Sequence, residues 1–297
     1  MIGLLGAVGI SAAGIYVYLF RRPAEWSKFT LWLSQESALP IPYGLTGYRF
    51  AQSADKIWRV GAWLSLIFTA VCFYLWLSQL GIDPIRSMLG VWFLTWLPGL
   101  YGYYTTELGN TEPFGFALMV LAIVLHTYAP WASVICACAS AIFLPLAPIL
   151  IGLCAWSFWP LLALALPLYQ AIKGRHVEVP TNAPAEITKH FRLGHKFGFG
   201  AGRSDQIRNA RIMILPWGAL ALLFLYSVGQ AASVQLLGAA MGALLVSYVM
   251  AFWEHRHTCN ALLAACPVIA CAVMCESLEW VLLAAFLQPF TASEGSS

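Results

Sequence analysis

The chain has 297 residues, of which 60% are hydrophobic and only 10% are charged, and its mean hydropathy is +0.74. A soluble domain carries about a quarter charged residues, so this composition excludes an ordinary soluble protein and predicts an all-α polytopic membrane protein. The net charge of +3 is typical of a membrane protein with basic cytoplasmic loops and gives no indication of a nucleic-acid partner.

The chain opens with an apolar segment, residues 1–20, that is closed by Arg21 and Arg22. This segment lacks the basic start and the small-residue cleavage site of a signal peptide, so we expect a retained first membrane helix. The following residues are polar and aromatic by turns. Three apolar side chains at helical spacing predict a short amphipathic helix lying in the membrane interface: Trp26, Phe29 and Leu33.

Apolar runs predict about nine membrane spans in total, because a helix needs about 20 residues to cross a bilayer. The spans cover approximately 1–20, 60–80, 88–104, 114–129, 131–150, 152–172, 212–229, 231–253 and 258–275. The last apolar piece, 280–290, is too short to cross alone and is expected to extend the preceding helix or to lie at the surface.

Three parts follow from this division. Residues 1–172 form an N-terminal membrane module, 173–211 form a basic loop, and 212–297 form the C-terminal membrane helices. The basic loop has eight Lys or Arg and three acids, so the positive-inside rule places it in the cytoplasm. Five predicted spans then place loop 21–59 outside, although that loop itself has a net charge of +3. The positive-inside rule therefore cannot hold for both loops, because both are basic and the predicted spans put them on opposite sides of the membrane.

A polar segment, 107–113, lies between two apolar runs that are each long enough to cross a bilayer. Polar groups at a membrane face are costly unless they are solvated, paired or used, so Glu107, Asn110 and Glu112 are candidates for one wall of a site. Their alternative role is structural: the acids keep the loop in water, and Asn110 or Thr111 caps the helix entered at Pro113.

Glu25 is the second candidate. A carboxylate on a loop can act as a general base, or it can bind a divalent cation together with Glu107 or Glu112. The alternative is that Glu25 forms a solvated ion pair with Arg21, Arg22 or Lys28. The eight cysteines lie almost entirely in apolar runs and contain no Cys-x-x-Cys pair, so no zinc site or disulfide framework is expected.

Over roughly residues 1–170, these features resemble a GT-C superfamily membrane glycosyltransferase of the polyprenyl-phosphate-sugar-dependent, mannosyltransferase-like kind. The resembling positions are Glu25-Trp26, Pro42-Tyr43-Gly44, Tyr48-Arg49-Phe50, the Trp-led span 58–76, Gly109-Asn110-Thr111-Glu112 and 143–148. Glu25 stands where the family usually has Asp, and the basic residue expected before Pro145 is absent.

The resemblance implies transfer of a sugar from a polyprenyl-phosphate donor at the external face of a bacterial inner membrane, with the lipid-linked donor and membrane lipids as partners. It implies that Glu25 is the base and that Asn110 and Glu112 position the sugar. The phosphate is then neutralised by Arg49, or by Arg21 with Arg22. Tyr43 and Glu107 complete the expected substrate-binding set.

A second interpretation is a non-catalytic integral membrane subunit of a larger complex, which has other membrane proteins as partners. Close helix packing by small residues favours it, at Gly238, Ala239, Ala240, Gly242 and Ala243. A transporter or channel is the third interpretation, although the two halves of the sequence show no matching pair of broken helices.

Overall fold

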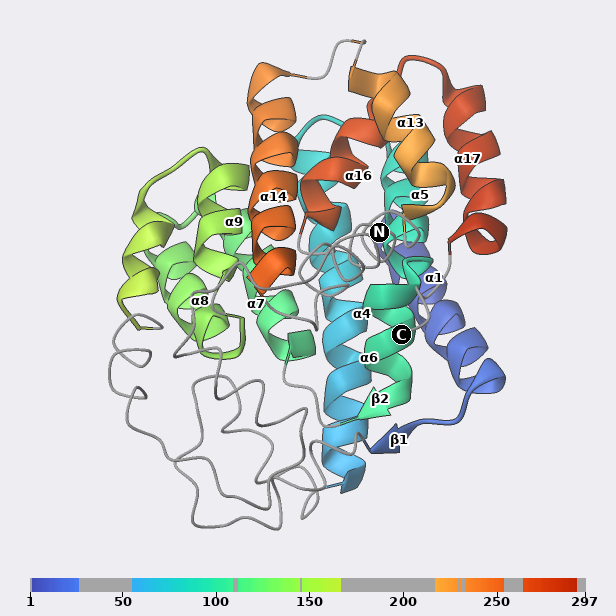
Figure 1. Cartoon of the computed structure of the whole chain (residues 1–297), viewed down its shortest axis with the longest axis horizontal. Helices are drawn as coiled ribbons and strands as arrows, with labels where there is room; N and C mark the ends of the chain where they lie inside the picture. Colours follow the sequence, from blue (N-terminus) through green and yellow to red (C-terminus); the bar gives the residue numbers. More distant parts are fainter. Residues whose placement is uncertain are drawn as a thin grey trace.

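The structure, a computed structural model, describes residues 2–26, 55–108, 112–144, 146–166, 217–228, 230, 233–253 and 264–292. These residues are almost entirely helical, which confirms the all-α fold (Figure 1). The N-terminal elements are α1 (Ile2–Arg21), β1 (Glu25–Trp26), α4 (Asp55–Gln79), α5 (Pro84–Thr95), the π-helix η1 (Pro98–Gly102), α6 (Tyr103–Thr106) and β2 (Glu107–Leu108).

The remaining elements are α7 (Glu112–His126), α8 (Pro130–Phe143), α9 (Ala147–Ala155), the 3₁₀ helix η2 (Trp159–Leu164), α13 (Ala219–Val228), α14 (Val234–Trp253), α16 (Ala265–Val273) and α17 (Leu278–Thr291). The C-terminal helices pack on the N-terminal ones, since α16 and α17 both contact α5 and α14 contacts α9. The described helices therefore form one bundle.

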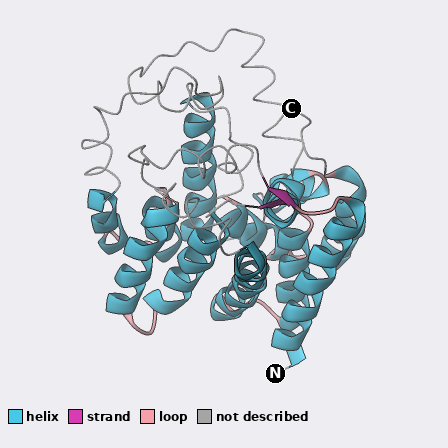
Figure 2. Ribbon diagram, turned by 90° about the horizontal axis from the view of Figure 1, so that it is seen from below, coloured by secondary structure: helices cyan, strands magenta, loops and turns pink. Residues whose placement is uncertain are grey.

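The described helices lie side by side in a bundle (Figure 2). The bundle has two ends, and successive helices run between them in alternating directions (Figure 1). We call the end where β1 pairs with β2 the ladder end. The helices α1, α5, α8, α14 and α17 run towards it, whereas α4, α7, α13 and α16 run away from it. The element α9 also leaves this end, and η2 returns towards it along α9 and α8.

Four predicted spans coincide with single helices, namely 1–20 with α1, 60–80 with α4, 114–129 with α7 and 231–253 with α14. The predicted span 88–104 is interrupted, because α5 ends at Thr95 and the chain continues as a π-helix from Pro98, which has no N–H to continue an α-helical ladder. The last apolar piece forms a separate helix, α17, rather than an extension of α16.

The predicted spans 131–150 and 152–172 do not form single helices in the described residues. The helix α8 ends at Phe143, and α9 ends after nine residues at Trp156, whose φ of 50° lies in the left-handed region. Each new helix has a proline at its first or second position, Pro148 in α9 and Pro160 in η2, where the missing N–H costs nothing. Trp26 is in β1 rather than in an amphipathic helix, and 27–54 and 173–211 lie outside the described residues.

Two described helices, α1 and the part of α4 from Ile57 to Gln79, are long and apolar enough to cross a membrane. One face of α4 is both apolar and exposed at helical spacing, through Ile57, Val60, Leu64, Phe68 and Leu75. A continuous exposed apolar stripe of this kind is unusual on a protein surrounded by water, and it is what a lipid-facing helix presents.

Tyr101 in η1 is fully buried where α1, α4 and η1 meet. Its hydroxyl donates to the Leu66 carbonyl at 2.5 Å and lies 3.1 Å from the Ser11 hydroxyl. Both polar partners of the phenol are thus inside the protein, which avoids the cost of a buried unsatisfied group. This contact joins three segments that are far apart in the sequence.

The helices α7 and α8 approach closely at Gly115. A Cβ on Gly115 would lie 2.9 Å from the Phe143 Cβ and 2.9 Å from the Leu144 Cδ1. The short separation lets the Ser140 hydroxyl donate to the Gly115 carbonyl at 2.7 Å. Close packing by small residues and interhelical hydrogen bonds are typical of helix contacts in membranes.

The helix α17 contains Pro289, which cannot donate to the carbonyl of Ala285 one turn earlier. The indole N–H of Trp92 in α5 donates to that carbonyl at 2.9 Å. The acceptor left without a partner by the proline is therefore satisfied by a neighbouring helix, and α17 is fixed to α5 at this point.

Replacement of Gly115 by alanine should destabilise the bundle by about 1–3 kcal/mol, because the added methyl group overlaps Phe143 and Leu144. The matched control is Gly9→Ala in α1, where no described atom lies within 4 Å of the position that a Cβ would take. Gly9→Ala should be neutral or stabilising. Unfolding of the purified proteins in detergent measures both, and equal effects would contradict the proposed contact.

Trp92→Phe should cost about 1–2 kcal/mol of stability through the lost hydrogen bond to Ala285. In a Pro289→Ala background, residue 289 can donate to Ala285 within α17, so the cost of Trp92→Phe should fall by about 1 kcal/mol. A double-mutant cycle of unfolding free energies measures this coupling. Additive effects would show that the indole does not replace the missing donor.

Candidate functional site

The two candidate polar segments meet at the ladder end. The strands β1 and β2 pair in parallel, with Glu25 opposite Glu107 and Trp26 opposite Leu108. The segment after the first helix therefore lies beside the segment before Phe114. About 80 residues separate the paired positions, so only the tertiary fold can bring them together.

The first turns of α4 hold these segments in place. Arg59 donates from Nη1 to the Ala24 carbonyl at 3.3 Å, immediately before β1. One turn later, Trp63 donates from Nε1 to the Thr105 carbonyl at 3.3 Å, shortly before β2. Trp58 packs edge-on against Phe114 in the first turn of α7, with ring centroids 5.2 Å apart. The start of α4 thus contacts all three polar segments.

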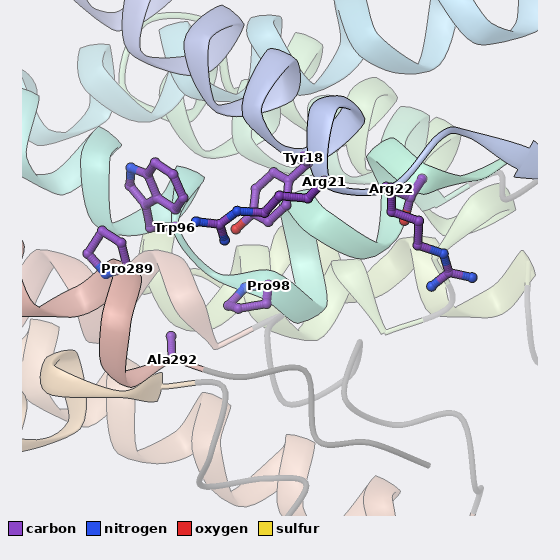
Figure 3. A pocket seen from close by; sticks show the side chains of 8 residues that line it. Tyr18, Arg21, Arg22, Trp96, Pro98, Pro289 and Ala292 are labelled. Carbon is purple, nitrogen blue, oxygen red and sulfur yellow. The ribbon is translucent and has the colours of Figure 1, made fainter.

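A cavity of about 320 Å³ lies next to the ladder, among the ends of α1, α5 and α17. Figure 3 shows the side chains that line it, which are Tyr18, Arg21, Arg22, Trp96, Pro98, Thr106, Pro289 and Ala292. The volume is at the lower end of the range of small-molecule sites, and the lining combines aromatic and apolar groups with two guanidinium groups. Such a lining suits an anionic group attached to an apolar or planar one.

The two arginines differ in direction. Arg21 extends towards Trp96, and its guanidinium carbon is 5.7 Å from the indole centroid, within the range of a cation–π contact (Figure 3). Arg22 extends the other way. Tyr18 packs on Trp96 with ring centroids 5.8 Å apart and donates its hydroxyl to the Thr95 carbonyl at 3.3 Å. Arg21 is therefore the cation held across the cavity.

The C-terminal helix supplies a wall of the cavity that the sequence analysis missed. Gln288 in α17 is fully buried, and its amide nitrogen donates to the Trp96 carbonyl at 3.4 Å. Its amide oxygen accepts the Leu220 N–H at 2.9 Å in the first turn of α13. A single side chain thus fixes the end of α5, which carries Trp96, to two C-terminal helices.

The predicted site residues do not all line this cavity. Arg21 and Arg22 do, whereas the described lining does not include Glu25 or Glu112. Glu25 is exposed, and Glu112 is half-buried as the first residue of α7, where the helix dipole stabilises a carboxylate. For Glu107 the structure describes only the backbone, and Tyr43, Arg49 and Asn110 lie outside the described residues.

Within the described ranges, no group of three or more His, Cys, Asp or Glu side chains is placed to hold a metal ion. The proposed divalent cation between Glu25 and the acids near position 110 stays a prediction. The site as described offers cations and aromatic rings beside a carboxylate-bearing segment, which is suited to binding an anion.

Gln288→Met should destabilise the protein by about 1–3 kcal/mol, because it leaves the buried Leu220 N–H and Trp96 carbonyl without their partner. The matched control is Gln79→Met, at a half-buried residue with one bond to the Val124 carbonyl, which should cost about 1 kcal/mol or less. Unfolding in detergent compares them. A smaller effect at Gln288 than at Gln79 would contradict its assigned role.

Comparisons of the chain with protein-family models, with curated proteins and with solved structures find no match.

Proposed function

We propose that the chain is an integral membrane protein that crosses the bilayer nine times. The crossing segments are α1, α4, α5 with α6, α7, α8, α13, α14, α16 and α17, and α9 with η2 forms a hairpin that enters and leaves at the ladder end. The composition and the exposed apolar stripe of α4 support this proposal. Among the described helices, α1 and the part of α4 from Ile57 to Gln79 are both long and apolar enough to cross a membrane.

We further propose that the protein is a glycosyltransferase that uses a polyprenyl-phosphate-linked sugar. The observation that carries the proposal is the cavity beside β1 and β2, in which Arg21 lies over Trp96. Arg21 precedes Glu25 by four residues in the sequence. Such an enzyme needs a carboxylate, cations for the leaving phosphate and access for a lipid carrier at one place.

In the proposed reaction, the oxygen of an acceptor hydroxyl forms a bond to the anomeric carbon of the sugar. The bond from that carbon to the phosphate oxygen breaks, and the polyprenyl phosphate leaves with the electron pair. The hydroxyl proton passes to the Glu25 carboxylate. Arg21 stabilises the charge that develops on the phosphate, which is a preorganised electrostatic contribution.

The cavity volume suits a headgroup rather than a whole lipid. A chain of many isoprene units is much larger than about 320 Å³, so the hydrocarbon must lie outside the cavity. The aromatic surfaces of Tyr18 and Trp96 suit stacking against a sugar ring. The family resemblance implies that Glu112 and Asn110 position the sugar.

Arg21→Gln should lower donor consumption by about 10- to 100-fold, because it removes the cation that is fixed over Trp96. Arg22→Gln serves as the matched control, since its side chain extends away from Trp96, and its effect should be smaller. The measurement is consumption of a polyprenyl-phosphate sugar by purified protein in lipid. Equal activity of Arg21→Gln and wild type would remove Arg21 from the site.

Glu25→Gln should lower transfer by about 100-fold or more if Glu25 is the base, and Glu112→Gln should have a smaller, positioning effect. Glu279→Gln is the control, because Glu279 is an exposed glutamate in the first turn of α17 at the other end of the bundle. Full activity in both site variants would exclude these acids from the mechanism. No consumption by the wild-type chain would favour the non-catalytic subunit instead.

A further inference from the structure

We infer that the ladder end of the bundle, with its arginine-lined cavity, faces the cytoplasm. This inference rests on the membrane assignment made above but is independent of glycosyl transfer. With this orientation, the cavity is open to phosphate-bearing ligands of the cytoplasmic leaflet. This orientation also reverses the placement of loop 21–59, which the predicted spans put on the external side. Three features of the molecule lead to it step by step: where the helices end, where the charges lie, and which charges the opposite end carries.

The first step is that many helix ends meet at the ladder end. The contacts of Arg59, Trp63 and Trp58 place the start of α4 beside the end of α1 and the start of α7. Phe143 at the end of α8 packs on Phe114, with ring centroids 6.1 Å apart. The helices α1, α6 and α8 therefore end, and α4 and α7 begin, on the same side of the bundle.

The C-terminal helices also begin or end at the ladder end. The Ala219 N–H in the first turn of α13 donates to the Thr291 hydroxyl at 2.8 Å, so α13 begins where α17 ends, near the cavity. The helix α14 runs antiparallel to α9, since Gly238 approaches Trp156 and Gly242 approaches Leu153. Because α9 leaves the ladder end, α14 arrives there, and α16 starts from it.

The second step is the distribution of positive charge. The chain has 16 Lys and Arg residues. Four of them belong to described segments at the ladder end, namely Arg21, Arg22, Lys56 and Arg59. Eleven more occur in the sequence ranges 27–54, 167–216 and 254–263, each of which is joined on both sides to described residues at the ladder end. Loops shorter than about 60 residues that carry an excess of Lys and Arg stay in the cytoplasm.

The third step is the opposite end, where the described segments contain a single Lys or Arg, Arg86. Its side chain donates to the Glu276 carbonyl at 2.9 Å and lies 3.6 Å from the Asp83 carboxylate. Glu276 and Glu279 are both exposed there. The acids in the described segments at this end outnumber Arg86, and Arg86 already has an acidic neighbour. The charges at this end therefore do not prevent it from crossing the membrane to the external side.

The hairpin of α9 and η2 explains why the sequence analysis found a conflict. Five predicted spans between loops 21–59 and 173–211 placed the two basic loops on opposite sides. In the structure four passes separate them, α4, α5 with α6, α7 and α8, and the hairpin returns the chain to the ladder end. Both basic loops can then obey the positive-inside rule.

The two chain ends provide a direct test of the inference. Ile2 at the start of α1 lies at the opposite end, close to Tyr74 through Gly3 and far from the ladder. A reporter fused at Ser297 is joined through five residues to Ala292, directly after α17, and an extended segment of that length reaches about 17 Å. This distance is shorter than the hydrocarbon core of about 30 Å, so such a reporter lies on the side of the ladder end.

The first experiment labels single cysteines with a membrane-impermeant maleimide in intact bacterial cells that express the full chain. The native cysteines are replaced, and Pro23→Cys and Tyr128→Cys are introduced at exposed positions of the ladder end and the opposite end. We expect Tyr128→Cys to react in intact cells and Pro23→Cys to react only after permeabilisation. The reverse pattern, or reaction of both in intact cells, would overturn the inference.

The second experiment covers the case in which the cysteine-free chain fails to fold. Green fluorescent protein, or alkaline phosphatase, is fused to the C-terminus of the otherwise unchanged chain. We expect fluorescence and no phosphatase activity, because α17 ends at the ladder end, which we place in the cytoplasm. Phosphatase activity without fluorescence would overturn the inference. Neither experiment measures glycosyl transfer, so a failed enzyme assay leaves the result intact, and a reversed topology leaves the enzyme proposal to be tested on the other face.

Discussion

The pairing of β1 with β2 is the constraint on which the rest of the site depends. Two residues on each side form a short parallel ladder that fixes the end of α1 against the end of the α5–α6 segment. With these ends together, Arg21 is held over Trp96, and the cavity forms between them and α17. The buried hydroxyl of Tyr101 stabilises the same arrangement from within the bundle, because it joins α1, α4 and η1.

Several elements could be predicted from the sequence because hydrophobic length decides them. The helices α1, α4 and α7 coincide with uninterrupted apolar runs. The two acidic segments are separated by two predicted spans, 60–80 and 88–104, and an even number of passes returns the chain to the same end. The hairpin at Trp156 could not be predicted in this way. Apolar residues continue through the turn, and prolines such as Pro148 are also tolerated within membrane helices, so composition cannot distinguish a kink from a reversal.

The cavity wall formed by α17 could not be predicted from the sequence, for a different reason. Gln288, Pro289 and Ala292 are close to Trp96 only through tertiary packing, and a short apolar segment near the end of a chain fits a surface helix equally well. The one local signal is the buried glutamine itself, since an amide in an apolar segment requires partners. Its partners, the Leu220 N–H and the Trp96 carbonyl, lie 68 and 192 residues away.

The composition of that wall also has a consequence for biosynthesis. Arg21 leaves the ribosome 268 residues before Pro289, and both line the cavity. The cavity therefore cannot be complete on a nascent chain that has not yet reached α17, however many of the earlier helices have already been inserted. A chain that stops before α17 would lack one wall of the cavity, so binding competence arises only after α17 has been made.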